Sequence, residues 1–459
     1  MQEMTEQIQL RREDGSFQPE FVRSVQSSID SRDKAELHGL VQDLHEGDLA
    51  DLMELLRPDQ RMQLIETLGT DFDINVLPEL DEPVRDQLIE EMPNEQVAEA
   101  VRELESDEAV YILEDLEESE QSDILAKIPH VARAALERSL EYPEDSAGRL
   151  MQADVIAVPP FWSVGQTIDY MRETDDLPDI FSELYVVDPA FHPLGSVPLS
   201  RIMRSKRPVK IESITDTDLY VVDVTQDQED VARDFERYSL ISAPVIDENK
   251  RLVGVVTADD IVEVVQEEAE EDIHRLGGVG DESLADSILR TTKNRLTWLL
   301  VNMMTAVLAS IVISWFDATI EQMVALAILM PIVASMGGNA GTQTMTVAVR
   351  ALATRDLGAV NARRLVIREA VVGLFNGFVF AAILAAVTIV WFGNNQLGAV
   401  IAAAMVFNMM IAGLAGILIP LALDWLKIDP AVASTVFVTT VTDVVGFFAF
   451  LGLAALWLV

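Results

Sequence analysis

Apolar positions in the first part of the chain repeat at the spacing of helices. Leu49, Leu52, Met53 and Leu56 fall at i, i+3, i+4 and i+7, so they share one face of a helix. The same spacing returns over residues 97–104 and 109–116. Two runs open alike, HEGDLADLMELL and ESDEAVYILEDL, which predicts an α-helical solenoid of stacked hairpins over residues 33–145. Residues 1–32 are predicted to be a flexible N-terminal tail.

Beyond residue 151 the apolar positions gather into short runs that are typical of strands. Helical stretches lie between them, near residues 164–172, 229–238 and 259–271. This alternation predicts two β-α-β-β-α units in tandem, over residues 146–212 and 213–273. The expected strands are residues 185–187, 209–211, 220–222, 244–246 and 252–256.

The remainder of the chain holds five long apolar segments. Each is long enough to cross a hydrocarbon core of about 30 Å, which takes roughly 20 helical residues. The distribution of basic residues places the large N-terminal half in the cytoplasm and the C-terminus outside, in a multi-pass protein of the cell inner (plasma) membrane. The segments are residues 296–316, 323–352, 366–392, 397–423 and 431–459.

A connecting stretch, residues 274–294, precedes these segments. Residues 281–293 carry Leu284, Ile288 and Leu289 on one face, which predicts an amphipathic helix that leads into the first span. The chain is therefore expected to be a multidomain membrane protein, with a five-helix transmembrane domain over residues 295–459.

Two polar interruptions mark the apolar part. The stretch PIVASMGGNAGTQ, residues 331–343, combines poor helix formers with Asn339, and a broken helix with free carbonyls is tolerated in a membrane only inside protein or along a water-filled path. We expect close packing through small residues together with a pore, and packing alone is the alternative. Asp443 is a lone acid inside the last span, and such a residue marks an ion or proton path. Together they indicate a protein that moves a cation.

Net charge sharpens this picture. The formal charge is −43, and residues 1–293 hold 69 acidic and 26 basic residues, while the rest of the chain is balanced. Such an acidic N-terminal half is not expected to bind nucleic acid, because the phosphates of nucleic acid require positively charged partners. It attracts divalent cations, which take carboxylate oxygens as ligands. A solvated acidic surface that serves solubility is the alternative for most of these acids.

Chemistry typical of enzymes has little support. The chain has no cysteine, its five histidines do not pair at metal-ligand spacing, and it has no GxxxxGK[ST] loop for ATP hydrolysis. We therefore expect no enzymatic activity and no catalytic residues.

The second β-α-β-β-α unit, with SAPVIDENKRLVGVVTADDIVEVV, resembles a CBS (cystathionine-β-synthase) domain. Its Gly254, Thr257 and Asp260 look like the adenosine-nucleotide site of that family, which implies ATP as a modulator. A helix N-terminal acid and a metal ligand are the alternatives for Asp260. The first unit departs from the pattern, because Pro198 and Arg201 stand where threonine and aspartate are expected.

The order of the parts resembles the MgtE family of magnesium channels. The stretches PIVASMGGNAGTQ, VRALATRDL and DPAVASTVFVTTVTD are the most specific pieces of this resemblance. It implies a homodimer with the pore on its two-fold axis. It also implies Mg2+ as both substrate and regulator, with cytoplasmic domains that sense Mg2+ and close the pore through a connecting plug helix.

Pore residues follow from the resemblance. Asp443 matches the family's pore acid and Asn339 its polar pore residue. Carbonyls near Gly337 and Gly338, together with Thr439 and Thr442, are expected to line the rest. Asp429 matches an acid near a pore mouth, and a helix N-cap is its alternative role.

Sensor residues follow in the same way. Tyr111 and Ser239 stand where the family has acids, so some sensing sites are expected to be absent or weaker here. The residues that match Mg2+-binding positions between the domains and along the plug helix are Asp107, Glu229, Asp260, Glu263, Glu268, Glu271 and Asp272.

Other functions remain open at this stage. One is a proton-coupled divalent-cation transporter in which Asp443 takes up a proton. Another is a membrane metal sensor that conducts nothing. A CBS-regulated anion channel is disfavoured by the acid in the pore.

Overall fold

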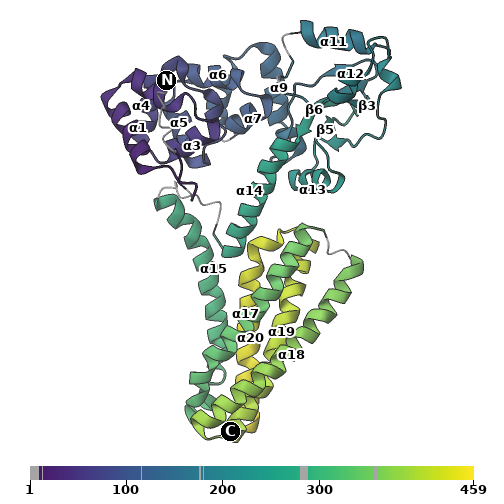
Figure 1. Cartoon of the computed structure of the whole chain (residues 1–459). Coiled ribbons are helices and arrows are strands. Elements are labelled where there is room, and N and C mark those ends of the chain that lie inside the picture. The colour runs from purple at the N-terminus through teal and green to yellow at the C-terminus, as the bar shows by residue number, and fades with distance from the viewer. Residues whose placement is uncertain are drawn as a thin grey trace, which may run out of the picture. The chain divides into compact units, whose positions relative to one another are not determined.

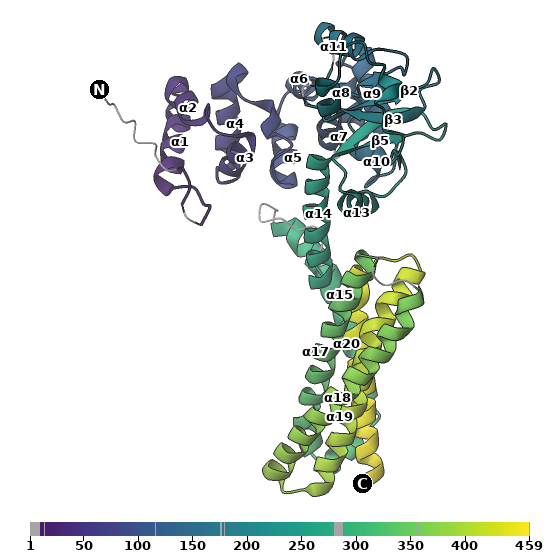
Figure 2. The same cartoon turned by 45° about the vertical axis from the view of Figure 1, so that its right-hand side comes forward.

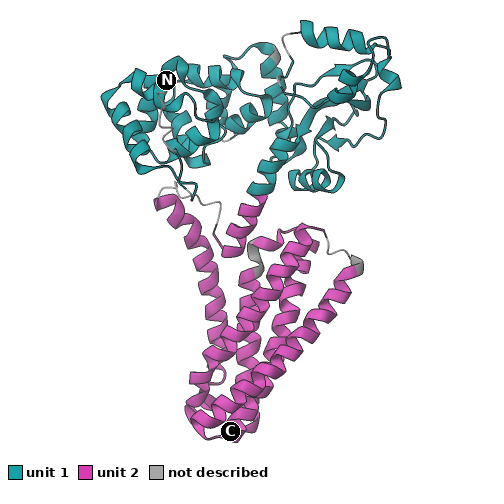
Figure 3. Cartoon of the chain, viewed as in Figure 1, with its two compact units in different colours: residues 1–267, 283–285 teal, residues 268–282, 286–459 magenta. Residues whose placement is uncertain are grey.

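A computed structural model describes residues 10–12, 14–114, 116–174, 177–178, 180–279, 288–355 and 359–458. The chain divides into two compact units, one running to Glu267 and the other built from Glu268 onward (Figures 1 and 3).

Unit 1 begins with a helical N-terminal domain. The predicted α-helical solenoid is confirmed, and consecutive helices pack in pairs such as α1 with α2, α4 with α5 and α6 with α7. Prolines stand at helix starts, as at Pro58 and Pro93. The helices are α1 (Pro19–Ser31), α2 (Lys34–Val41), α3 (Glu46–Glu54), α4 (Pro58–Leu68), α5 (Glu82–Glu91), α6 (Asn94–Glu103), α7 (Ser106–Glu114), α8 (Glu118–Leu125) and α9 (His130–Leu140), with 3-10 turns at Gly69–Asp71 and Ile74–Val76.

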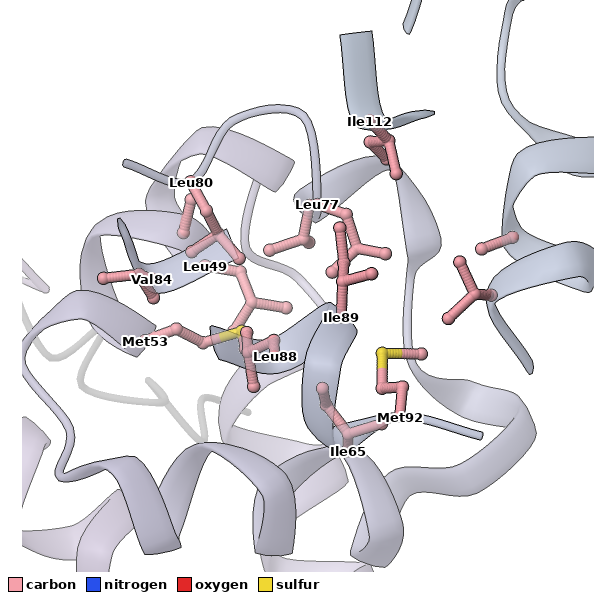
Figure 4. Close-up of a cluster of buried hydrophobic side chains, with 14 of the residues drawn as sticks. Leu49, Met53, Ile65, Leu77, Leu80, Val84, Leu88, Ile89, Met92 and Ile112 are labelled. Carbon is pink, nitrogen blue, oxygen red and sulfur yellow. The ribbon is translucent and has the colours of Figure 1, made fainter. Parts of the chain in front are cut away.

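One continuous apolar core runs through this domain. Figure 4 shows side chains from α3, α4 and α5 meeting those of the turn that precedes α5. Leu77 and Leu88 are each 1% exposed, and Ile112 on α7 joins the same core. The core thus extends to α7, the helix that also carries the predicted sensor residue Asp107.

The prediction of a flexible tail over residues 1–32 is wrong for α1. Phe21, Val25 and Ile29 repeat at i, i+4 and i+8, and all three are buried in the core of the domain. The serines and charged residues between them hide this short apolar stripe in the sequence. The stripe becomes buried only because α2 and α4 pack against it.

Phe21→Ala is expected to loosen α1 from the domain, because removing a buried phenylalanine costs about 3–5 kcal/mol. Hydrogen exchange in α1 and α2 of the full-length protein should accelerate strongly. Phe161→Ala is the matched control, since Phe161 is 64% exposed and its loss should leave exchange in these helices unchanged. Exchange in wild-type α1 at the rate of an unstructured peptide would contradict the assignment.

The predicted tandem β-α-β-β-α repeats are confirmed. In each repeat the first strand pairs parallel with the second, and the second pairs antiparallel with the third. The first repeat holds β1 (Ala157–Val158), α11 (Val164–Glu173), β2 (Glu183–Val187), β3 (Pro193–Pro198) and α12 (Leu199–Arg204). The second holds β4 (Val222–Asp223), α13 (Gln228–Tyr238), β5 (Ser242–Ile246), β6 (Leu252–Thr257) and α14 (Ala258–Gly277).

The strand predicted at residues 209–211 is wrong. The carbonyl of Val209 accepts the N–H of Val164 at 2.8 Å, and Lys210 makes an isolated bridge to Ser163. Ile211 then opens a 3-10 turn (Ile211–Ser213). Its apolar side chain is buried against the first sheet without joining a strand ladder, so hydrophobicity alone was misleading. The short strand β1 and the proline-flanked strand β3 were missed.

The two repeats are interleaved, because part of the segment predicted for the first repeat (residues 146–212) packs in the core of the second. Helix α10 (Ala147–Leu150) precedes the strands of the first repeat in sequence, but it packs in the hydrophobic core beside the sheet of the second repeat. Ala147 and Gly148 donate their N–H groups to the carbonyls of Gln226 and Val224 at 2.8 and 2.9 Å. This exchange of segments ties the repeats to each other.

Unit 2 contains five helices that are long and apolar enough to cross a membrane, as predicted. Helix α19 is the centre of the bundle and packs against α17, α18 and α20 (Figures 1 and 2). The described helices are α15 (Ile288–Ser314), the short α16 (Asp317–Gln322), α17 (Ala325–Ala353), α18 (Ala359–Phe392), α19 (Asn395–Trp425) and α20 (Pro430–Trp457).

The predicted connecting helix over residues 281–293 lies largely outside the described residues, which omit 280–287. Its described flanks belong to other helices, because α14 runs on to Gly277 and α15 starts at Ile288. The part of the predicted plug stretch that the structure describes before residue 280 is therefore the end of α14.

Candidate functional site

An acidic cavity lies within unit 1, between the start of α7 and the start of α14. Its volume is about 380 Å3, and among the described residues that line it eleven are acidic while one, Arg149, is basic. Nη1 of Arg149 lies 2.9 Å from Oε2 of Glu114. One arginine does not balance this many carboxylates. The acidic residues are Glu46, Glu79, Glu105, Asp107, Glu108, Glu114, Asp145, Asp259, Asp260, Glu263 and Glu267.

Asp107 and Asp260, from the N-terminal domain and the second repeat, come together at this cavity. Asp107 is 9% exposed, and its Oδ1 is buried without a hydrogen-bond partner in the described part of the chain. Asp260 accepts hydrogen bonds from the backbone N–H and the hydroxyl of Thr257, at 3.1 and 2.6 Å. Burial raises the pKa of both carboxyls, and the charge of Asp260 raises the pKa of Asp107 further.

Glu263 stands one helical turn after Asp260 on the same helix. Burial raises the pKa of Glu263 to about 7, and the charges of Glu79 and Asp260 add to this effect. Burial also raises the pKa of Glu105 and of Glu108, which the sequence interpretation had not singled out. Their signal was the acidic run ESDE at the start of α7, of which only Asp107 was selected.

Packing of α7 on α14 is expected to weaken as pH rises. Glu263 binds its proton more tightly in the packed form, so its contribution is fully present below its ordinary pKa of 4.5 and is lost as pH rises toward about 7. Hydrogen exchange of α7, corrected for the intrinsic pH dependence of exchange, should therefore be slower at pH 5.5 than at pH 7.5 without divalent cations. Glu263→Gln should flatten this difference, and an unchanged difference in that variant would contradict the assignment.

The donor set of the cavity fits a hydrated divalent cation. Among the described residues, no group of three or more His, Asp or Glu side chains is arranged to hold a metal ion directly. Mg2+ dehydrates reluctantly and is usually held by one or two carboxylates with several waters retained. The partnerless Oδ1 of Asp107 and the mutual repulsion of the carboxyls suit that mode of binding.

Glu229, another predicted sensor residue, is not among the described residues that line the cavity. Glu229 pairs with Arg233 on α13, with 3.3 Å between Oε1 and Nη2. Ser239 ends the same helix in a left-handed conformation, with φ of 53°. Tyr111 does line the cavity, and its hydroxyl donates to Oε1 of Glu267 at 3.4 Å while its ring stacks on the buried Arg85. At this position an aromatic ring and an arginine occupy the place of the expected acid.

The residues of the expected nucleotide pattern are engaged by the fold. A Cβ at Gly254 would lie 2.5 Å from Sδ of Met151 and 2.7 Å from the carbonyl of Gln152, so glycine is needed where α10 crosses the second sheet. The hydroxyl of Thr257 donates a hydrogen bond to the carboxylate of Asp260 at the start of α14. These contacts give the pattern a structural role in addition to any ligand.

A second charged group lies in unit 2, at the end of α14. Arg275 forms ion pairs with Glu271 on its own helix and with Asp429 at the start of α20. Asp429 also caps α20 by accepting the N–H of Ala431 at 2.8 Å, so the predicted N-cap role is present together with the ion pair. Burial and the charge of Asp429 raise the pKa of Asp272. Glu268 precedes this group by one turn of the same helix.

The last turn of α14 packs between the ends of α17 and α20. Leu276 contacts a cluster that includes Met345 and Val349 of α17 and Val438 of α20. The hydroxyl of Thr435 donates to the carbonyl of Leu276 at 3.2 Å. The end of α14 is thus fastened to the two helices that carry Asn339 and Asp443.

Asp443 lies on α20, inside an apolar span. Its side chain is half-buried and makes no hydrogen bond or ion pair with any other residue that the structure describes. On the neighbouring helix α17, Ser335, Asn339 and Thr346 are exposed along one face. Unit 2 therefore presents an unpaired carboxylate on one helix and a polar face on its neighbour.

The expectation of a broken helix at residues 331–343 is wrong. Helix α17 is continuous from Ala325 to Ala353, with Pro331 inside it, so carbonyls near Gly337 and Gly338 belong to a regular helix. The glycines allow close packing instead, because a Cβ at Gly341 would lie 2.5 Å from Cγ1 of Val438. The structure therefore supports a packing role for these small residues, and a pore along the same stretch stays a prediction.

Thr442 also departs from its expected place in the pore lining. It is fully buried, and its methyl group packs near Gly341 of α17. Thr439 is half-buried and lies beside Gly338. Both hydroxyls donate to carbonyls of their own helix at 2.9 Å, which satisfies them without a pore ligand.

This architecture defines an integral membrane protein in which a helical domain and two β-α-β-β-α repeats precede five long apolar helices. Comparison with family models agrees. Residues 330–453 match the MgtE model, described as a divalent cation transporter; residues 44–145 match the MgtE intracellular N domain; and residues 147–207 and 211–267 match the CBS domain. The chain belongs to the MgtE family.

Relatives of known function extend this result. The magnesium transporter MgtE of Bacillus subtilis (strain 168) is 33% identical over 321 residues, which cover 70% of this chain and 71% of the relative. The magnesium transporter MgtE of Thermus thermophilus is 33% identical over 329 residues, which cover 71% and 73%. A crystal structure of the cytosolic domain of the Mg2+ channel MgtE in complex with ATP matches with a TM-score of 0.50 and 25% identity, over 53% of this chain and 99% of that chain.

Proposed function

We propose that this protein is a Mg2+-selective channel for magnesium uptake, closed by cytoplasmic Mg2+. The unpaired carboxylate of Asp443, on a helix that packs against α17 in a member of the MgtE family, carries this proposal. A carboxylate in an apolar span is costly, and it is retained where it meets a permeating cation.

The channel is a homodimer with the pore on its two-fold axis. One chain leaves the face of Ser335, Asn339 and Thr346 exposed, although a polar face is unfavourable against lipid. Pairing this face with its copy would bring two Asp443 carboxylates toward one axis. Two carboxylates with retained waters suit a hydrated divalent cation.

The channel lies in the plasma membrane with its C-terminus outside. The inward electrical gradient then drives a divalent cation with about 4.6 kcal/mol per 100 mV, twice the roughly 2.3 kcal/mol for one charge. No chemical energy source is required for uptake.

The acidic cavity of unit 1 is the sensor. Repulsion among Asp107, Asp260 and their neighbours opposes the packing of α7 on α14, and bound divalent cations supply the missing counter-charge. Because the packed form binds such cations better, rising Mg2+ shifts the population toward it. Glu268, Glu271 and Asp272 extend the acidic surface along α14.

The end of α14 is the plug. Leu276 lies between α17 and α20, and Arg275 fastens it to Asp429. Packing of the sensor holds this turn in place and closes the pore.

Leu276→Ala is expected to leave the channel leaky, with at least about threefold more flux at high cytoplasmic Mg2+, because truncating a half-buried leucine removes roughly 1 kcal/mol or more of packing. The measurement is Mg2+ flux in proteoliposomes as cytoplasmic-side Mg2+ is raised. Ile273→Ala is the matched control, since Ile273 is on the same helix and 67% exposed. Equal closure in both variants would count against a plug at Leu276.

ATP acts as a modulator at Gly254, Thr257 and Asp260. The ATP complex of the related cytosolic domain supports this assignment. Equilibrium binding of ATP to the full-length protein tests it. Binding should weaken in Thr257→Val, and unchanged affinity would place ATP elsewhere.

Mg2+ entry into proteoliposomes, with a fluorescent indicator inside, tests the function as a whole. The rate of Mg2+ uptake should increase with an imposed inward membrane potential, and a pH gradient across the membrane should not change it. Uptake that requires a pH gradient would favour the proton-coupled transporter. Mg2+-dependent compaction of unit 1 without uptake would favour the non-conducting sensor.

A further inference from the structure

The side chain of Asn408 lies where three membrane helices cross. Asn408 is on α19 and is fully buried. Its Nδ2 donates to the carbonyl of Val333 on α17 at 2.9 Å. Its Oδ1 is also buried and has no hydrogen-bond partner among the described residues. A half-satisfied amide inside a membrane bundle is unfavourable, so its presence calls for a role beyond filling space.

Two glycines from different helices make room for this amide. A Cβ at Gly337 of α17 would lie 2.3 Å from Nδ2 of Asn408, and a Cβ at Gly446 of α20 would lie 2.9 Å from the same atom. Both distances are shorter than real carbon contacts, so a side chain at either position would displace the amide. Asn408 is therefore wedged between α17 and α20.

The wedge lies beside the two residues assigned to the pore. Gly337 stands two residues before Asn339 on α17, and Gly446 stands three residues after Asp443 on α20. Any movement of the amide changes the spacing or rotation of α17 against α20 at this level. The same movement changes the spacing between Asn339 and Asp443.

We propose that Asn408 is a positioning residue for cation selection, which fixes Asn339 relative to Asp443 by holding α17 against α20. The inference rests on the proposed pore. Selection between cations depends on the size of the cavity and the placement of its ligands, and Mg2+ demands stricter geometry than Ca2+. Loss of the Asn408 contact is therefore expected to increase Ca2+ flux while the pore still conducts Mg2+.

Flux of Mg2+ and of Ca2+ through the reconstituted full-length protein tests this role. In Asn408→Leu the ratio of Mg2+ to Ca2+ flux should fall at least about fivefold, because ligand spacing is no longer fixed. Gly446→Ala should lower the ratio in the same way, since it displaces the amide without removing it. This second variant keeps the test decisive if Asn408→Leu does not fold.

Thr388→Val is the matched control. Thr388 is a fully buried residue of α18 whose hydroxyl also lacks a partner in the described chain, so this change removes a comparable polar group away from α17 and α20. Its flux ratio should equal that of the wild type. Wild-type ratios in both folded wedge variants, or an equal loss in Thr388→Val, would overturn the positioning role.

Asp443→Asn is measured in parallel to separate the two proposals. If Asp443→Asn abolishes flux while the wedge variants keep wild-type ratios, the positioning role fails and the pore stands. If Asp443→Asn conducts like the wild type, the pore assignment itself fails and the positioning role fails with it.

Discussion

Asp443→Asn should lower Mg2+ flux by at least roughly 100-fold, because in the proposed dimer two Asp443 carboxylates each contribute on the order of 1.5–3 kcal/mol through charge-assisted hydrogen bonds to the hydrated ion. The amide keeps the size of the side chain and removes its charge. The loss therefore reports electrostatics rather than packing. Flux is measured in proteoliposomes at low cytoplasmic-side Mg2+, where the channel is open.

Asp317→Asn is the control for this change. Asp317 is an exposed acid at the start of the short helix α16, outside the spans, and its neutralisation should leave flux unchanged. Equal flux in Asp443→Asn and Asp317→Asn would show that Asp443 has a structural role only. The cation path would then have to be sought elsewhere along the polar face of α17.

The double variant Asp107→Asn/Asp260→Asn should close the channel at much lower Mg2+. Both carboxyls have raised pKa values, because burial disfavours their charged forms and because a neighbouring acid repels each of them, Asp260 in the case of Asp107 and Asp259 in the case of Asp260. Neutral amides remove that repulsion, so α7 can pack on α14 without a bound cation to neutralise the two carboxylates. The Mg2+ concentration for half-closure should fall at least about tenfold, since one pKa unit of relieved interaction corresponds to about 1.4 kcal/mol.

Glu103→Gln/Glu118→Gln provides the same change in net charge at exposed positions of the N-terminal domain. It should leave the half-closing concentration unchanged, which separates a local effect from an effect of total charge. A half-closing concentration that rises in the Asp107/Asp260 variant would mean that these groups act chiefly as ligands rather than as a source of repulsion.

Much of the fold could be predicted because it rests on periodicity within single segments. The apolar face of α3 and the five apolar spans are local patterns, and the structure confirms both kinds of element. Errors arose where burial depends on distant partners. Helix α1 looks polar until α2 and α4 cover its stripe, and Ile211 is apolar without being in a strand.

The candidate site shows the same division. Asp443 stands out in sequence as a lone acid in an apolar run, and Asp107 enters through resemblance. The sequence does not reveal that Arg275 reaches Asp429, because more than 150 positions separate the two residues (|i−j| = 154). It likewise hides the wedge of Asn408 between Gly337 and Gly446, since Asn408 and Gly446 lie in ordinary apolar segments and Gly337 stood out only as a poor helix former. Glycines that suggested a break in α17 turned out to serve packing.

The most direct test of the central claim is the current through reconstituted wild-type channels at a fixed inward potential, while Mg2+ on the cytoplasmic side is stepped from micromolar to millimolar levels. The account predicts a Mg2+ current at the low level that disappears reversibly at the high level. A current that ignores cytoplasmic Mg2+, or the absence of any current at the low level, would contradict it.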